Sequence, residues 1–492
     1  MRIPLDRQSD VPLYRQIGSY LRQSILSGNL QADTRLPACR QLARDLGVNR
    51  ITVENAYSEL EADGLVSSRM GSGTYILPQN HFTVIQKNDP EALWPLWQRS
   101  VKDRDTESKS YMVEQTLKAS GHPYPIDFSS GSGDSRQFPA DEFRKVLQAV
   151  MRRDDTAALD YGEGSGYAPL REGIAHILAS QGLQADSENI LITAGSQQAI
   201  FLVSQVLLKP DDIVLVENPT YSIAIELFHR LGFQVIGVPM DGQGMQVEKL
   251  ENLLQQYHPK LIYTIPNFHN PTGTCLSNPR RRQLIVLADR YNVPILEDDF
   301  VGDLRYEGHS QPSLKALDPG GQVIYVSTFS KMLMPGLRIG FIVANGPVYD
   351  GLLNFKHLSD LATSTLIQRA LDSYVTVGRY QAYLRRSCQI FHKRRDAMLG
   401  AIEHYLPPDV SCDAPKGGLF IWLRLPDGLL ADELLPLACE VGVAFAPGNC
   451  FFTDGLGGRE WLRLNFVSQP VEDIEEGIKR LGLAVHQLQE HR

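Results

Sequence analysis

The chain has 492 residues, of which 43% are hydrophobic and 21% are charged, and its net charge at pH 7 is -9. This length exceeds what one hydrophobic core usually serves, so we expect at least two domains, and the composition excludes a largely disordered protein. The negative balance excludes a surface that is basic throughout, but it leaves room for a small nucleic-acid-binding domain.

The sequence indicates neither a membrane span nor a cysteine-based zinc site. Residues 1–6 contain no apolar stretch of the kind that begins a secretion signal, and the apolar runs are too short to cross a bilayer, so we expect a cytoplasmic protein. The six cysteines show no Cys-x-x-Cys spacing, which predicts neither a zinc site nor a disulfide framework.

Residues 12–77 show the pattern of three helices followed by a β-hairpin, the order of a winged helix-turn-helix. The first helix ends at Gly28 and the second at Gly47, and the third has apolar residues at i, i+3, i+4 and i+7 from Val53. A short strand at 65–67, a turn at 71–73 and a strand at 74–76 then predict the wing.

Two helices joined by a tight turn suit DNA, because the second can enter the major groove while the first lies on the backbone. A three-helix protein-interaction domain fits the periodicity equally well. Nine arginines and eight acidic residues in residues 1–77 favour neither alternative. The residues expected near DNA are Arg40, Asn49, Arg50 and Thr52, with Arg69 and Gly71 on the wing.

A resemblance favours DNA. Residues 36–43, 46–53, 56–57 and 71–75 closely resemble the GntR family of bacterial transcription regulators, which implies salt-sensitive binding to duplex DNA. The chain departs from the family's usual pattern at Ala38-Cys39, where small hydroxylated residues are typical, and at Asn49, where serine is common. These departures concern phosphate contacts, for which Arg40 and Arg50 remain.

Residues 78–124 lack sustained periodicity and are interpreted as a linker that ends in a partly ordered segment. The two tryptophans in Trp94-Pro95-Leu96-Trp97 either anchor this segment on the next domain or pack on a local helix.

From Ile126 onward, short apolar runs alternate with segments of helical length, which predicts βαβ units and a mainly parallel sheet covered on both faces. A later set of runs predicts a smaller α+β subdomain. The first set comprises 190–193, 213–216, 235–238, 261–265, 293–296, 323–326 and 339–344, and the later set comprises 418–425, 443–446 and 461–466.

Lys331 follows one of these buried runs, with hydroxyl residues just before it and Arg338 shortly after it. A buried amine in this position suits a Schiff base to pyridoxal 5′-phosphate (PLP), with the hydroxyls and the arginine on the phosphate. A surface lysine in a Ser/Thr-rich loop is the alternative for Lys331 taken alone.

Other polar residues also follow strands, where open α/β sheets bind ligands. Ser196-Gln197 opens a helix whose N–H groups suit a phosphate, and Tyr221 offers a ring for stacking. Among the acids 297–299, a carboxylate facing a pyridine nitrogen would keep that nitrogen protonated. A structural metal or a surface acidic loop is the alternative for these acids.

Taken together, residues 125–490 resemble the fold-type I, class I/II aminotransferases. The resemblance implies that Lys331 forms the Schiff base, Asp298 pairs with the pyridine nitrogen and Arg463 binds a substrate carboxylate. A tyrosine often follows the pairing aspartate by three residues, where this chain has Val301. The remaining implied contacts are Asn270 with the ring hydroxyl, Tyr221 on the ring, Tyr161 with the phosphate of the partner subunit's site, and Ser196, Gln197, Thr328, Ser330 and Arg338 with the phosphate.

The whole chain resembles the MocR subfamily of GntR regulators. The expected architecture is a DNA-binding domain (1–77), a linker (78–124) and an aminotransferase-like α/β domain (125–492) with a small C-terminal α+β subdomain. The implied function is a PLP-binding transcription regulator that senses an amine, an amino acid or PLP and binds paired DNA half-sites as a homodimer. An aminotransferase with a DNA-binding appendage and a scaffold without cofactor remain as alternatives.

Overall fold

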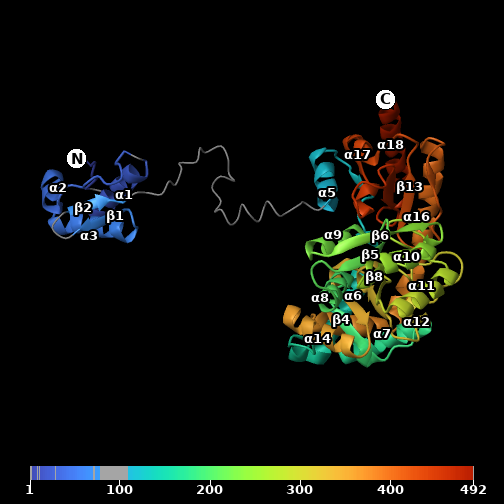
Figure 1. Cartoon of the computed structure of the whole chain (residues 1–492). Helices are drawn as coiled ribbons and strands as arrows, with labels where there is room; N and C mark the ends of the chain where they lie inside the picture. The colour runs from blue at the N-terminus through green and yellow to red at the C-terminus, as the bar shows by residue number, and fades with distance from the viewer. Residues whose placement is uncertain are drawn as a thin grey trace. The chain divides into compact units, whose positions relative to one another are not determined.

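The computed structural model describes residues 3–7, 9, 11–27, 29–69, 73–77 and 109–490. The chain divides into two compact units, residues 1–106 and 107–492 (Figure 1). Each unit has its own hydrophobic core, so we describe each by itself.

The N-terminal unit is the predicted winged helix-turn-helix. Gly47 ends α2 with a φ of 62°, a left-handed conformation that glycine adopts without strain and that turns the chain sharply towards α3. The Tyr57 hydroxyl donates a hydrogen bond of 2.9 Å to the Pro37 carbonyl, which ties α3 to the segment before α2. The elements are α1 (Leu13–Leu26), α2 (Cys39–Leu46), α3 (Arg50–Ala62) and the antiparallel hairpin of β1 (Val66–Arg69) and β2 (Gly73–Ile76).

The large unit is built on an eight-stranded sheet in the order β4-β11-β10-β9-β8-β5-β6-β7. The pairs among β10, β9, β8, β5 and β6 are parallel, as predicted, whereas β11 runs antiparallel to both of its neighbours. The strands are β4 (Ile190–Thr193), β5 (Ile213–Asn218), β6 (Gln234–Asp241), β7 (Gly244–Met245), β8 (Leu261–Thr264), β9 (Ile295–Asp298), β10 (Val323–Thr328) and β11 (Gly340–Val343).

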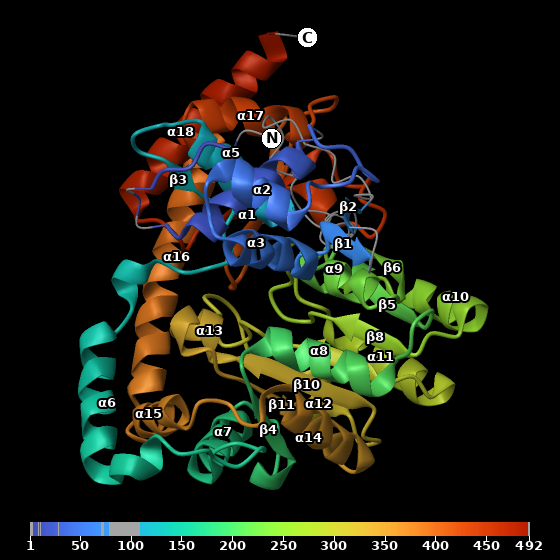
Figure 2. The same ribbon diagram turned by 90° about the vertical axis from the view of Figure 1, so that its left-hand side faces the viewer.

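Successive side chains along a strand point to opposite faces of the sheet. Helices cover both faces here, so both sets of side chains are packed (Figure 2). On β5, Leu215 packs with α10 and α11, while its neighbours Val214 and Val216 belong to the larger core on the other face. The helices are α6 (Ala140–Asp154), α7 (Ala168–Ser180), α8 (Ser196–Leu207), α9 (Ser222–Arg230), α10 (Val247–Tyr257), α11 (Asn278–Tyr291), α12 (Leu314–Leu317), α13 (Phe329–Met332), α14 (Pro347–Asp360) and α15 (Thr365–Thr376).

The long helix α16 (Arg379–Tyr405) connects the large sheet to the predicted smaller subdomain, where it packs against α18 (Val471–Glu490) (Figure 2). The subdomain contains a four-stranded sheet in the order β12-β13-β16-β15. Its other elements are α17 (Ala431–Glu440), β3 (Ile126–Asp127), β12 (Ser411–Cys412), β13 (Phe420–Arg424), β14 (Val443–Ala444), β15 (Ala446–Pro447) and β16 (Trp461–Asn465).

The bounds of several strands differ from the sequence prediction. The run 443–446 is two strands rather than one, because β14 pairs with β3 while β15 pairs with β16. Strand β9 begins at Ile295 instead of residue 293, next to Pro294, which has no N–H to donate. Helix α5 (Lys109–Ala119) agrees with the partly ordered segment expected at the end of the linker, and its Val113 and Leu117 pack against the α17 region.

Candidate functional site

A pocket of about 130 Å³ lies between the strand ends of the large sheet and the smaller subdomain. It brings together predicted residues from six separate segments of the chain. Six of the predicted site residues line it: Lys331, Asp298, Asn270, Tyr221, Ser196 and Arg463. The remaining walls are Ser129, Gly131, Ser222, Ile223, Ile265, Phe300 and Phe420.

Lys331 lies in the short helix α13, directly after β10. The Thr328 hydroxyl accepts a hydrogen bond of 3.0 Å from the Ser330 N–H and so fixes the turn from strand to helix. Burial lowers the pKa of Lys331 to about 8, and the nearby positive charges of Arg463 and Arg338 act in the same direction. A much larger fraction of this amine is therefore unprotonated near neutral pH than of an exposed lysine, which makes it a better nucleophile.

Asp298 ends strand β9 and lies in the wall of the pocket. Its Oδ2 accepts a hydrogen bond of 2.9 Å from the Tyr263 hydroxyl, whereas its buried Oδ1 has no partner among the described residues. Burial raises the pKa of Asp298 to about 7, and the Asp299 and Glu217 carboxylates add to this, although the Tyr263 hydrogen bond opposes it. An unpaired buried carboxylate is costly, so this oxygen suits a cationic N–H donor.

The adjacent acids face other parts of the structure. Asp299 accepts hydrogen bonds from the Asn267 amide at 3.1 Å and the Tyr325 hydroxyl at 2.9 Å. Glu297 accepts from the backbone N–H groups of residues 314 and 315 at 2.7 and 2.8 Å. Of the three acids, Asp298 is the one that lines the pocket.

Arg463 extends from β16 and is almost fully buried. It donates to the Asn270 Oδ1 at 2.8 Å and to the Ser129 carbonyl, while its Nε has no partner among the described residues. The centre of its guanidinium lies 4.1 Å from the Phe420 ring and 5.0 Å from the Phe451 ring. Burial lowers the pKa of Arg463 to about 10, and the group has no carboxylate partner in the pocket. This cation therefore suits a carboxylate ligand.

A second cluster of predicted residues surrounds the start of α8. Gly195 precedes this helix with a φ of 96°, and a Cβ there would lie 2.8 Å from the Arg338 Nη2. The Arg338 side chain donates to the Ala194 carbonyl at 3.1 Å and reaches the Ser330 hydroxyl at 3.4 Å. Ser196 and Gln197 begin the helix, so their N–H groups and the arginine make a corner that suits an anion, which we name the anion-binding corner.

Three predicted residues have additional or different contacts. The hydroxyl of Thr328 donates to the Ile339 carbonyl at 3.1 Å in addition to capping α13. Tyr221 lines the pocket, and burial raises its pKa to about 12. Tyr161 does not line this pocket, and the residue is 84% exposed.

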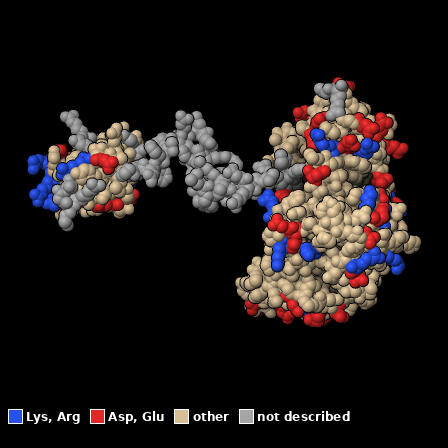
Figure 3. All heavy atoms as spheres, in the orientation of Figure 1, with Lys and Arg blue, Asp and Glu red and all other residues tan. Residues whose placement is uncertain are grey.

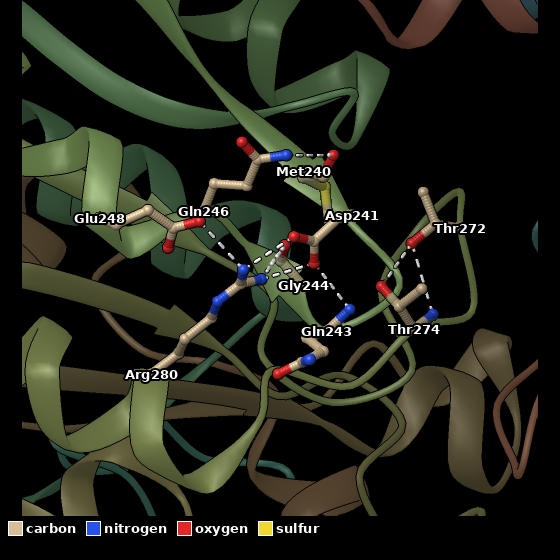
Figure 4. A network of polar contacts seen from close by, with 9 residues as sticks. All are labelled: Met240, Asp241, Gln243, Gly244, Gln246, Glu248, Thr272, Thr274 and Arg280. Carbon is tan, nitrogen blue, oxygen red and sulfur yellow. Dashed lines mark hydrogen bonds and ion pairs between the residues drawn. The ribbon is translucent and has the colours of Figure 1, made fainter.

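A second hollow, with a volume of about 410 Å³, lies beside the loop that carries Asn270. In Figure 4, Arg280 clamps both carboxylate oxygens of Asp241 at 2.5 and 2.7 Å and also reaches Glu248 at 3.1 Å. On the other side of Asp241 from Arg280, the hydroxyls of Thr272 and Thr274 lie 2.7 Å apart. These contacts brace the β6–β7 hairpin and the Asn270 loop.

In the N-terminal unit, the predicted contact residues lie on or next to α2 and α3. Basic side chains gather at the α2 side of this unit (Figure 3), and Arg40 is exposed there. Asn49 is the N-cap of α3, where its side chain accepts from the Ile51 N–H at 3.1 Å. Arg50 pairs with Glu54 at 2.6 Å, and Thr52 is half-buried. Gly71 and the side chain of Arg69 lie outside the described residues.

Sequence reasoning missed several of these functional groups. Tyr263 places a hydroxyl within the apolar run of β8, and this polar group was the signal available in the sequence. Phe420 and Phe451 become neighbours of Arg463 through tertiary packing, for which the sequence contains no local signal.

The described part of the chain has neither a candidate metal cluster nor a candidate membrane span. No group of three or more His, Cys, Asp or Glu side chains there could hold a metal ion. No helix in that part of the chain is long and apolar enough to cross a membrane.

Comparison with known proteins assigns both units to families. Residues 126–481 match the class I and II aminotransferases, and residues 13–76 match the gntR family of bacterial regulatory proteins. The HTH-type transcriptional regulator YdfD of Bacillus subtilis is 31% identical over 98% of each chain. The probable rhizopine catabolism regulatory protein MocR of Rhizobium meliloti is 30% identical over 90% of this chain and 88% of its own.

Solved structures resemble the large unit. LysN, an alpha-aminoadipate aminotransferase from Thermus thermophilus complexed with N-(5′-phosphopyridoxyl)-L-leucine, is 33% identical and has a TM-score of 0.73. The similarity covers 80% of this chain and 100% of that one. The chain therefore belongs to the MocR-like regulators, in which a GntR-type helix-turn-helix domain is fused to a class I and II aminotransferase domain.

Proposed function

We propose that this protein is a PLP-binding transcription regulator that acts as a homodimer in the cytoplasm. Residues 1–77 bind operator DNA, residues 78–124 connect the domains, and residues 125–492 bind PLP and sense an amine, an amino acid or PLP itself. The observation that carries the proposal is the pocket in which the Lys331 amine, the unpaired Asp298 oxygen and Arg463 meet, in a chain that also has a DNA-binding domain.

The residues of the pocket fit PLP at each of its polar groups. The unpartnered Oδ1 of Asp298 suits the protonated pyridine nitrogen, and it holds the charge that makes the ring an electron sink when PLP is bound. The Asn270 Oδ1 accepts a hydrogen bond from Arg463, which leaves the amide N–H₂ of Asn270 to donate to the ring oxygen. Tyr221 supplies the stacking face.

The anion-binding corner at the start of α8 supplies the phosphate site. Ser196 and Gln197 contribute helix N–H groups, and Arg338 contributes the positive charge. Ser330 completes the corner with a hydroxyl, which accepts from Arg338 and keeps its hydrogen for the phosphate. Thr328 contributes by holding the Ser330 N–H, because its own hydroxyl hydrogen is donated to the Ile339 carbonyl. We assign Tyr161 to the phosphate of the partner subunit's site, because its side chain is exposed and lies outside its own pocket.

Effector binding uses the two remaining groups of the pocket. The amine of Lys331 would hold the cofactor, whose aldehyde carbon exchanges one amine for another, so that an effector amine would leave the lysine as a free amine. Arg463 binds a carboxylate on the effector, because it is a buried cation that lacks an acidic partner in the pocket. A ligand that binds two domain arrangements unequally shifts their populations, and this shift changes DNA binding.

A spectral titration with parallel DNA binding tests the proposal. We expect the purified chain to show the absorbance band of lysine-bound PLP, and we expect an amine or amino-acid effector to change both the band and the affinity for its own upstream DNA. Lys331→Ala should lose the band and the DNA response together. A chain that shows no such band, with a DNA response that Lys331→Ala leaves intact, would refute the sensing role.

An active aminotransferase with a DNA-binding appendage is the second candidate. It is favoured by the presence of both Lys331 and Arg463 in one pocket. Steady multiple turnover of an amino donor and a keto acid would support this candidate, whereas a single stoichiometric conversion would not.

A further inference from the structure

The outer face of α3 begins with an apolar side chain. Ile51 is 61% exposed, and Val11, at 48%, is the other large hydrophobic side chain with comparable exposure in the described part of the N-terminal unit. The buried face of the same helix already has Val53, Ala56, Tyr57 and Leu60, so Ile51 is not needed for the core.

Asn55 follows Ile51 by one helical turn and lies on the same face. Its side chain is exposed and makes no hydrogen bond or ion pair with the described residues. Ser58 continues this exposed stripe, so the stripe has no charge. Arg50, whose side chain is paired with Glu54, lies at the start of the helix beside the stripe.

The chemistry of the two residues points to particular bases. An isoleucine side chain cannot bind a phosphate, and the apolar group that DNA exposes in its major groove is the C5-methyl group of thymine. An asparagine amide matches the N7 acceptor and the N6 donor of adenine. The thymine methyl group and the N7 and N6 groups of adenine both identify an A·T pair.

The geometry of the domain places these residues where base contacts are made. In helix-turn-helix proteins, the first residues of the second helix contact base edges in the major groove. The Asn49 cap fixes the backbone at Ile51, and the bond from Tyr57 to Pro37 ties α3 to the start of α2. Side chains one turn apart are separated by about 5–6 Å, against about 3.4 Å for each base pair. Ile51 and Asn55 would therefore contact base pairs one or two steps apart.

We propose that α3 recognises A·T pairs directly, with Ile51 against a thymine methyl group and Asn55 hydrogen-bonded to an adenine at a neighbouring step. The inference rests on the proposed function, because it requires that the N-terminal unit binds operator DNA. It assigns sequence recognition to two uncharged residues, while Arg40 and Arg50 serve the phosphates.

Base analogues in the DNA test each contact separately. The full chain is first used to select a high-affinity duplex from a random pool. Thymines in that duplex are then replaced one at a time by deoxyuridine, which lacks only the methyl group, and adenines by 7-deazaadenine, which lacks the N7 acceptor. At one position, deoxyuridine should weaken binding about fourfold, the equivalent of about 0.8 kcal/mol for one buried methyl group.

The protein variants show whether these effects belong to the two residues. Ile51→Ala should bind about fourfold more weakly and lose its response to that deoxyuridine. Asn55→Ala should lose at least about fivefold in affinity and become insensitive to 7-deazaadenine at a different position. Val11→Ala is the matched control, because it truncates the other exposed apolar side chain and should leave affinity unchanged. Thermal melting of each variant checks that the domain remains folded.

The outcomes separate this inference from the proposed function. A chain that selects no duplex from the pool contradicts DNA binding itself, and the base-recognition proposal falls with it. A chain that binds tightly but is insensitive to every deoxyuridine, or an Ile51→Ala variant that keeps the wild-type deoxyuridine response, overturns the role of Ile51 alone. Asn55→Ala with an unchanged 7-deazaadenine response overturns the role of Asn55.

Discussion

The charged groups expected to bind ligands lie in opposite environments in the two units. In the DNA-binding unit, Arg50 and Glu54 form an ion pair whose side chains are 50% and 38% exposed. In the large unit, Asp298 and Arg463 are almost fully buried, and burial shifts the pKa of each. Exposed pairs are worth little and are screened by salt, whereas buried charges are costly until a ligand pairs with them.

This difference indicates how each unit responds to a ligand. Asp298 and Arg463 each have a buried atom without a partner among the described residues, so a ligand that supplies the missing partner offsets the cost of burying that polar atom. Arg50 is exposed and already paired with Glu54, so under the proposed function DNA competes with Glu54 for it. We therefore expect large effects from substitutions in the pocket and small effects from substitutions on α3.

The largest effect is expected for Asp298→Asn. The neutral amide cannot hold the pyridine nitrogen in its protonated form, so PLP should bind about 100-fold more weakly, the equivalent of about 2.7 kcal/mol. Equilibrium titration of the absorbance band measures this loss. Tyr263→Phe, which leaves the carboxylate in place, should cause a smaller loss, and equal losses in the two variants would contradict the assignment.

In the protein without cofactor, Asp298→Asn should instead raise the free energy of unfolding. The ordinary pKa of the carboxyl is 3.8, and in the folded chain it is raised to about 7. The folded state therefore binds more protons than the unfolded state between these values, and its stability falls as pH rises through that window. Asp298→Asn lacks this penalty, so its advantage in free energy of unfolding should grow up to about pH 7 and then stay constant. Denaturant unfolding at several pH values measures the trend.

A smaller effect is expected for Arg463→Gln, and it should be confined to effectors with a carboxylate. Loss of a charged hydrogen-bonding partner of this kind costs about 2 kcal/mol, or about thirtyfold in affinity. An amino acid and the amine formed by its decarboxylation make the matched pair of ligands. The variant should weaken binding of the amino acid alone, and an equal loss for both ligands would contradict a carboxylate role.

The contrast between the units also explains what could be predicted from the sequence. The winged helix-turn-helix depends on contacts between close positions, so the periodicity from Val53 to Leu60 indicated its inner face. Lys331 and Asp298 follow buried strands, which indicated where they would meet. The contact of Arg463 with Asn270 spans 193 residues, and no local pattern shows that one side chain would orient the other. Ile51 was missed for a different reason: an exposed apolar residue has no periodic signal of its own.

The pH dependence of the rate of PLP capture tests the lowered pKa of Lys331. Because the pKa of Lys331 is lowered to about 8, the neutral amine should rise from about a tenth of the total at pH 7 to about nine tenths at pH 9. The rate of PLP capture should therefore increase about tenfold over this range and then level off. Arg338→Gln removes one of the positive charges that lower this pKa, so it should move the midpoint to higher pH. Stopped-flow absorbance at fixed ionic strength measures both profiles.

The smallest effect is expected for Glu54→Gln, and its sign is opposite to that of the pocket variants. Removing the carboxylate frees Arg50 for a phosphate, so DNA affinity should increase about threefold to fivefold, in keeping with the small energy of an exposed pair. The released arginine adds about one phosphate contact, so the dependence of log affinity on log salt should become steeper by about 0.9. Asp33→Asn is the matched control, because it makes the same charge change outside α2 and α3, at a left-handed position that asparagine tolerates. An equal gain in the control would mean that overall charge, rather than release of Arg50, sets the affinity. A loss of affinity in Glu54→Gln would mean that Glu54 orients Arg50 towards DNA. Arg50 would then resemble Arg463 in the pocket, which is held in position by its hydrogen-bond partner Asn270.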